Sequence, residues 1–149
     1  MKKKEVVAYT DGCYKNNTKM GGWGYILLYG EHTKENFHGE INTTNNRMEL
    51  MAVIKCLEAL KRPVTISVYT DSKYVQLGIS EWIHKWKLNG WKTASKKPVK
   101  NKDLWIKLDE LAIKHDINWK WVKGHNGNFL NERADKLANM GYKKILRSM

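Results

Sequence analysis

The stretch TNNRMELMAVIKCLEALKRPVTISVYTD, residues 44–71, contains the change of period that decides the expected fold. Its first part repeats apolar residues at the spacing of a helix, at Leu50, Val53, Ile54 and Leu57. Pro63 ends this pattern, and residues 64–70 follow as a β-branched strand that is too apolar for an exposed edge. A strand reached through a helix returns parallel to an earlier strand, so we expect residues 64–70 beside the first strand of the chain.

Outward from this stretch, the sequence predicts the rest of an α/β fold. Three strands are expected before it, at residues 5–10, 22–29 and 33–40, and their short connections favour antiparallel pairing. After it come short helical segments at 74–78 and 81–86, a helix over 101–115, a strand over 117–122 and a helix over 130–146. We therefore expect one mixed sheet of five strands, three antiparallel and then two parallel, flanked by helices.

The size and composition are those of a single globular domain over residues 1–149, with 42% hydrophobic and 28% charged residues. No apolar run approaches the ~18 residues that span a membrane, and no signal peptide is recognisable, so the cytoplasm is the expected compartment. The two cysteines, Cys13 and Cys56, are too few for a disulfide framework. We expect Cys56 to be a buried, reduced thiol in the first long helix.

The charge points to a polyanionic partner. The chain has 27 Lys and Arg against 15 Asp and Glu, a net charge of +12. Seven lysines and no acidic residue lie between Trp82 and Lys102, so 12 minus 7 leaves +5 for the rest. The positive charge is concentrated in one segment, as expected for a surface that grips phosphates.

Two aspartates follow two of the predicted strands in matching contexts. Asp11 occurs in YTDG, residues 9–12, and Asp71 in YTDS, residues 69–72. Each is expected just beyond the end of its strand, and parallel neighbouring strands would bring both carboxylates to one edge of the sheet. Asp-Gly and Asp-Ser are also ordinary turn and cap sequences, so the matched pair is more informative than either aspartate alone.

Two further acids are expected to lean towards this edge. Glu49 flanks the apolar stripe of the first long helix, in register with Val53 and Cys56, and Asp135 lies beside Ala134 on the last helix. Either acid alone is equally consistent with a solvated helix surface. Four carboxylates at one edge would repel one another unless divalent cations neutralise them, and oxygen ligands suit Mg²⁺ or Mn²⁺.

Together these motifs resemble those of the type 1 ribonucleases H of the bacterial kind. The resemblance covers almost the whole chain, and the matching motifs are residues 9–12 (YTDG), 44–50 (TNNRMEL), 70–72 (TDS), 122–125 (VKGH) and 131–135 (NERAD). It implies a ribonuclease H-like fold. It also implies an endonuclease that hydrolyses the RNA strand of RNA/DNA hybrids by two-metal-ion catalysis and leaves 5′-phosphate and 3′-hydroxyl ends.

The resemblance assigns roles to five residues. It implies that Asp11 bridges two Mg²⁺ ions, for which Mn²⁺ can substitute, and that Asp135 completes the ion that activates water. Glu49 and Asp71 would hold the ion on the leaving-group side. His125, in a glycine-bounded loop, would assist proton movement or product departure.

The resemblance also implies contacts to both strands of the hybrid. Asn17, Asn45 and Asn46 match residues that contact the RNA 2′-hydroxyl, although asparagines in loops and at helix starts are common, and Thr44 or Asn45 could simply cap the helix. Thr44 and Asn101 match a pocket for a DNA phosphate. Many relatives add an arginine to this pocket where the present chain has Asn42, so we expect a pocket that is weaker or is rebuilt with a nearby lysine.

Residues 81–102 resemble the basic protrusion, or handle, that grips DNA in many relatives. The residues expected to contact the DNA strand are Trp82, Trp86, Lys85, Lys87, Lys96 and Lys97. The alternative for the tryptophans is that they pack the handle helices. Since no separate hybrid-binding domain is recognisable before the catalytic unit, the handle is expected to supply most of the extra grip.

Two other functions remain open at this point. The chain could be a noncatalytic hybrid-binding module, which the intact Asp11, Glu49, Asp71 and Asp135 argue against. It could also be another metal nuclease on the same fold, such as a Holliday-junction resolvase or a transposase core. The handle and the Asn45-Asn46 pair fit hybrid recognition better. The expected partner is therefore an RNA/DNA hybrid, bound by a monomer without membrane contact.

Overall fold

The computed structural model describes residues 5–123 and 128–149 and has the expected mixed sheet. Its strands are β1 (Val6–Lys15), β2 (Met20–Tyr29), β3 (His32–Glu40), β4 (Thr65–Thr70) and β5 (Asp116–Trp121). They lie in the order β3-β2-β1-β4-β5, with antiparallel β3-β2-β1 pairs and parallel β1-β4 and β4-β5 pairs. The predicted fold class is confirmed, including the return of β4 beside β1.

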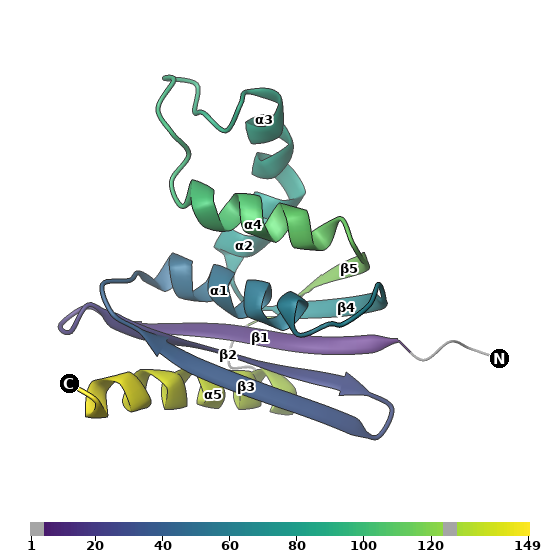
Figure 1. Ribbon diagram of the computed structural model, residues 1–149, viewed down its shortest axis with the longest axis vertical. Helices are drawn as coiled ribbons and strands as arrows, with labels where there is room; N and C mark the ends of the chain where they lie inside the picture. Colours follow the sequence, from purple (N-terminus) through teal and green to yellow (C-terminus); the bar gives the residue numbers. More distant parts are fainter. Residues whose placement is uncertain (1–4, 124–127) are drawn as a thin grey trace.

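Helices cover both faces of the sheet (Figure 1). They are α1 (Asn45–Glu58), α2 (Lys73–Leu77), the π-helical turn η1 (Gly78–Trp82), α3 (Ile83–Leu88), α4 (Lys102–Ala112) and α5 (Phe129–Arg147). Figure 1 shows α1 and α4 on one face and α5 on the other, with α3 far from the sheet. The larger core lies between the sheet and α1 and α4, and contains the fully buried Leu50, Val68 and Trp105.

The first strand is longer than predicted. It was expected to end at residue 10, but β1 continues to Lys15 because β2 pairs with it over its whole length, down to Lys15 opposite Met20. The parallel pairing of β1 with β4 does stop early, at Tyr9 opposite Tyr69. Asp11 is therefore inside a strand and not beyond its end, yet it lies two residues past the last parallel pair, as Asp71 does.

The two short helical segments predicted between β4 and the handle loop are continuous. Helix α2, η1 and α3 follow one another without a break from residue 73 to residue 88. A side chain at Gly78 would collide with the ring of Trp105, so glycine lets this segment pack directly on α4. The turn thus anchors the handle helix to the core.

The remaining boundaries differ from prediction by a few residues. Thr44 accepts a hydrogen bond from the Arg47 main-chain nitrogen and caps α1, which ends at Glu58, before Pro63.

Cys56 is buried and free, as expected, and so is Cys13. In the described part of the chain, no helix is long and apolar enough to cross a membrane.

Candidate active site

Three carboxylates meet where the β1–β4 parallel pairing ends. Asp11 comes from β1, Glu49 from α1, and Asp71 directly follows β4. Each can offer one oxygen such that the three oxygens lie within 4.8 Å of one another. The structure therefore brings together three of the four acids singled out in the sequence.

The backbone of Gly12 fixes two of these carboxylates. Its nitrogen donates hydrogen bonds to Oδ1 of Asp11 at 3.0 Å and to Oε1 of Glu49 at 2.5 Å. Helix α1 lies so close to β1 here that a Cβ on Gly12 would collide with the backbone of Met48 and Glu49. The glycine after Asp11 is thus required by packing, while its N–H, which any residue but proline would have, holds the two carboxylates.

Burial makes the cluster electrostatically unfavourable without a cation. Asp11 is only 4% exposed and Glu49 7% exposed. Desolvation, followed by the negative charges of Glu49 and Asp71, raises the pKa of Asp11 far above its ordinary value. Desolvation and the charge of Asp71 also raise the pKa of Glu49. Two buried carboxyl groups that resist ionisation, with a third acid converging on them, fit a hard divalent cation, which would neutralise their charge.

The fourth acid approaches from the opposite face of the sheet. Asp135 lies half-buried on α5, and its hydrogen-bond contact with Asp11 is among the causes that raise the pKa of Asp11. Asn139, one turn further along α5, donates to the main-chain oxygen of Asp135 at 2.9 Å. Asp135 is outside the group of three but adjacent to it, so the site draws on elements from both faces of the sheet.

Comparison with known proteins decides the family. The family model described as RNase H matches residues 3–143. The chain belongs to the RNase H family. The predicted resemblance is confirmed.

Curated relatives extend this result over nearly the full chain. A ribonuclease H of Cupriavidus metallidurans is 63% identical over 142 residues, which cover 95% of this chain and 98% of that protein. A ribonuclease H of Francisella tularensis subsp. novicida is 59% identical over 145 residues, covering 97% of this chain and 95% of that protein.

Solved structures have the same fold. The crystal structure of LC9-RNase H1, a type 1 RNase H with the type 2 active-site motif, is 28% identical with a TM-score of 0.85, over 97% of this chain and 74% of that one. The foamy viral protease-reverse transcriptase, solved in complex with dsDNA, is 27% identical with a TM-score of 0.77, over 95% of this chain and 96% of that chain. The RNase H fold assignment thus rests on both sequence and structure.

The residues predicted to contact RNA lie on two elements of this RNase H fold. Asn17 is exposed in the turn between β1 and β2, and Asn45 and Asn46 form the first turn of α1, four and three residues before Glu49. Thr44, not Asn45, caps the helix through its side chain. The asparagine side chains of α1 are therefore not used for capping. His125, the fifth predicted catalytic residue, lies outside the described residues.

The handle tryptophans pack against one another and against the core. Trp86 lies between Trp82 at 5.9 Å, Trp91 at 6.4 Å and Trp105 at 5.4 Å, measured between ring centroids. Trp82 and Trp86 are both half-buried. This arrangement favours the packing alternative for Trp86, whose ring has aromatic neighbours on three sides.

The handle lysines, in contrast, lie in water. Lys85, Lys87, Lys96 and Lys97 are all exposed. Lys87 forms an ion pair with Asp109 of α4 at 3.2 Å, so part of its charge is already compensated. Lys96 has a left-handed backbone, with φ of 64°, at the tip of the handle loop. The cations best placed for a polyanion are therefore those of the loop.

Sequence reasoning missed Arg47. Its guanidinium donates to Oδ1 of Asn101 at 3.2 Å and forms a two-bonded ion pair with Asp103, while its main-chain nitrogen donates to Thr44. Thr44 and Asn101, the two predicted phosphate-pocket residues, are thus bridged by an arginine of α1, where we expected either a weaker pocket or a nearby lysine. The signal was its position three residues after the cap, which places it on the same turn as Thr44.

Sequence reasoning also missed Asn131. Its side chain is 1% exposed, and neither amide atom has a hydrogen-bond partner among the described residues. It lies four residues before Asp135, one turn away on the same side of α5. Its place in the NERAD motif was the available signal, but nothing in the sequence indicated that the amide would be buried.

Proposed function

We propose that this chain is an endonuclease that hydrolyses the RNA strand of RNA/DNA hybrids and leaves 5′-phosphate and 3′-hydroxyl ends. The observation behind the proposal is the convergence of the buried Asp11, Glu49 and Asp71 in a member of the RNase H family. The sequence relatives are named ribonuclease H, which supports the same activity here.

The four carboxylates are proposed to hold two Mg²⁺ ions, or Mn²⁺ in their place. Asp11 would be shared, Asp135 would serve the attacking side, and Glu49 with Asp71 would serve the leaving side. When bound, the cations supply the charge that stabilises the attacking and leaving oxygens of an in-line phosphodiester displacement. Gly12 holds the Asp11 and Glu49 oxygens in place, which limits the rearrangement needed at the site.

RNA would be distinguished from DNA by amide side chains beside these carboxylates. Asn45 and Asn46 lie within one turn of Glu49 on α1, and Asn17 lies in the β1–β2 turn. An amide can both donate to and accept from a 2′-hydroxyl, the group that DNA lacks. His125 is proposed to assist proton movement or product departure, as its motif position implies.

The DNA strand would be held by positive charge away from the carboxylates. Thr44 and Asn101 would bind one phosphate, with Arg47 as the cation that compensates for the absence of an arginine at Asn42. The lysines at positions 85, 87, 96 and 97 would contact further phosphates, and Trp82 and Trp86 would border them.

We also propose that residues 1–149 act as one catalytic domain and as a monomer. All four carboxylates come from a single chain, on β1, α1, α5 and the segment after β4, so the site needs no second copy.

The test is cleavage of an RNA/DNA hybrid, labelled on the RNA strand, with Mg²⁺. Cuts in the RNA strand of the hybrid, with neither RNA duplex nor DNA duplex cut and no product in EDTA, are the expected result. Analysis of the ends should give 5′-phosphate and 3′-hydroxyl groups. Salt-sensitive binding of the hybrid without cleavage would instead favour a noncatalytic module, and cleavage of DNA junctions alone would favour a resolvase.

A further inference from the structure

A cavity lies at the edge of the sheet formed by β5, and the residue before Asp71, Thr70, is part of its lining. It has a volume of about 430 Å³, within the range of small-molecule binding sites. Its lining includes Trp119, Lys120 and Trp121 of β5 and residues of the α2–η1–α3 segment, among them Gln76 and His84. None of these residues has a role in the proposed cleavage reaction.

The cavity and the carboxylate cluster are linked by neighbouring residues at the end of β4. Thr70, which lines it, is the residue before Asp71. Trp121 is paired with Thr70 in the β4–β5 register, and the Val122 nitrogen donates to the Thr70 oxygen at 2.9 Å. The buried Thr70, which lines the cavity, is thus one residue from a carboxylate of the cluster.

The chemistry of the lining suits an unpaired nucleotide. Trp121 is 46% exposed, which leaves part of its indole free to stack, and Trp119 is half-buried against the core. The exposed His84 can donate to a phosphate, and the amide of Gln76 can bond the edge of a base. Lys120 alternates with Trp119 and Trp121 along β5 and lies near Glu5, whose pKa it lowers. Flat aromatic faces are surfaces on which proteins stack the bases of single-stranded nucleic acid.

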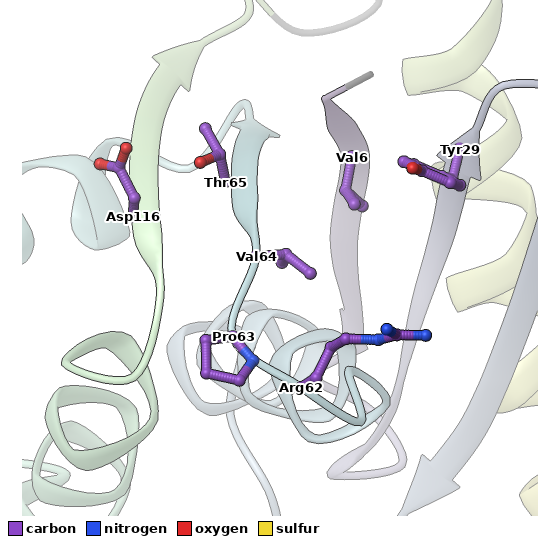
Figure 2. A pocket seen from close by; sticks show the side chains of 7 residues that line it. All are labelled: Val6, Tyr29, Arg62, Pro63, Val64, Thr65 and Asp116. Carbon is purple, nitrogen blue, oxygen red and sulfur yellow. The ribbon is translucent and has the colours of Figure 1, made fainter. Parts of the chain in front are cut away.

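Two other cavities differ in the residues that line them. The cavity of Figure 2 lies at the opposite ends of the same strands, where Val6, Thr65 and Asp116 begin β1, β4 and β5. It includes the acidic Asp116, and a third cavity includes Glu58, whereas none of the described residues lining the Trp121 cavity is acidic. The third cavity also carries Lys61, Arg62 and Lys114, so charge alone does not distinguish the Trp121 cavity. Its tryptophans do, because neither of the other two cavities has a tryptophan among its described lining residues.

We propose that this cavity binds a nucleotide of a single-stranded extension of the hybrid, with its base stacked on Trp121. The proposal rests on the proposed function, because the extension reaches the cavity from a hybrid held at the carboxylates. It implies that the enzyme binds the junction between a hybrid and single-stranded nucleic acid more tightly than the hybrid alone. Because the cavity lies to one side of the carboxylates, an extension of one polarity should be preferred.

The test compares binding of a short blunt hybrid with binding of the same hybrid extended by a few nucleotides, in EDTA to prevent cleavage. Four extended hybrids place RNA or DNA at either end. At least one extension should tighten binding by about five-fold or more, the effect of one base stacked on an aromatic ring. 2-Aminopurine in that extension should lose fluorescence as it stacks. Equal affinity for all five substrates would overturn the proposal.

Variants locate the effect. Trp121→Ala and His84→Ala should each reduce the gain from the extension while leaving affinity for the blunt hybrid unchanged, and Trp121→Phe should retain most of the gain. Tyr29→Ala is the matched control, since Tyr29 is 47% exposed and lines the cavity of Figure 2. Retention of the full gain and of the fluorescence change by His84→Ala and by a folded Trp121→Ala would refute the site. If the wild type neither binds nor cleaves the blunt hybrid, the proposed function is refuted instead.

Discussion

The main-chain nitrogen of Gly12 donates a 2.5 Å hydrogen bond to Oε1 of Glu49, across the contact between β1 and α1. Helix α1 approaches so closely because residue 12 has no side chain, and a Cβ there would collide with Met48 and Glu49. Glu49 and Asp11 are both proposed metal ligands. The position of Glu49 is therefore set by Gly12, the residue that follows Asp11.

Gly12→Ala should displace α1 from β1 and weaken cation binding. We expect the free energy of unfolding to fall by about 1–3 kcal/mol, as for an overpacked core, and Mg²⁺ affinity to fall by about ten-fold or more. Calorimetric titration and denaturant unfolding measure the two effects. Gly90→Ala is the control, because its Cβ would meet no atom within 4 Å and its positive φ of 64° costs only local strain. Unchanged Mg²⁺ affinity in Gly12→Ala would contradict the positioning role.

Asp11→Asn should abolish cleavage and stabilise the protein in EDTA. The pKa of Asp11 is raised by burial and by neighbouring carboxylates, so an uncharged isostere removes repulsion that the wild type must otherwise relieve by protonation. A gain on the order of 2–4 kcal/mol in the free energy of unfolding at neutral pH is expected. Thermal unfolding with and without Mg²⁺ provides the measurement. A less stable variant in EDTA, or one with normal turnover, would rule out the shared-ligand assignment.

The carboxylate cluster should also make stability depend on pH. The pKa of Glu49 rises from 4.5 to about 8 on folding, so its contribution is fully present below pH 4.5 and is lost as the pH rises towards about 8. His115 acts in the opposite direction, since burial lowers its pKa below 6.5. Both wild type and Asp11→Asn contain His115, so its contribution cancels in the difference between their free energies of unfolding in EDTA. That difference should widen with rising pH and shrink when Mg²⁺ is added. A difference that does not change with pH would disprove the electrostatic interaction between Asp11 and the other carboxylates.

The sheet was predictable because its signals are local. The change of period at residues 44–71 and the matching YTDG and YTDS motifs are each contained in a short segment, and they fix the parallel return of β4 beside β1. The position of Glu49 followed from helical periodicity alone. The early end predicted for β1 was wrong because its extension depends on pairing with β2, and no residue within β1 signals the length of its partner.

Side-chain partners between distant segments were not predictable. Trp86 packs on Trp105, and Arg47 bonds Asn101, 54 positions further along the chain. Both contacts depend on how α4 lies against α1 and α3, which sequence periodicity leaves undetermined. The sequence therefore predicted reliably which residue types the site requires. It predicted less reliably which of these side chains pack against the core and which remain free for substrate.

Neutralising the handle loop should weaken hybrid binding and flatten its salt dependence. In the triple variant Lys96→Ala, Lys97→Ala, Lys100→Ala, the slope of log affinity against log salt should fall by roughly one unit for each lost phosphate contact. Binding is measured at several salt concentrations in EDTA. The control neutralises Lys34, Lys143 and Lys144, which are exposed on β3 and α5. If both variants give the same slope, only net charge matters and the handle does not contact substrate.

Arg47→Ala should weaken hybrid binding without much loss of stability. The Arg47–Asp103 ion pair is at the surface, with side chains 33% and 65% exposed, so its removal should change the free energy of unfolding by less than about 1 kcal/mol. Hybrid affinity should fall by about five-fold or more, because a charged hydrogen bond to phosphate contributes about 1 kcal/mol or more.

A second variant tests the same pocket from the opposite direction. Asp103→Asn removes the competing acid and frees Arg47, so it should tighten binding at low salt. Arg133→Ala is the matched control, since Arg133 forms a similar pair with Glu35 at 2.6 Å, with side chains 32% and 29% exposed, between α5 and β3. An equal loss of affinity in Arg47→Ala and Arg133→Ala would show that Arg47 contributes only its charge to the overall field, and that Thr44 and Asn101 bind the phosphate without it.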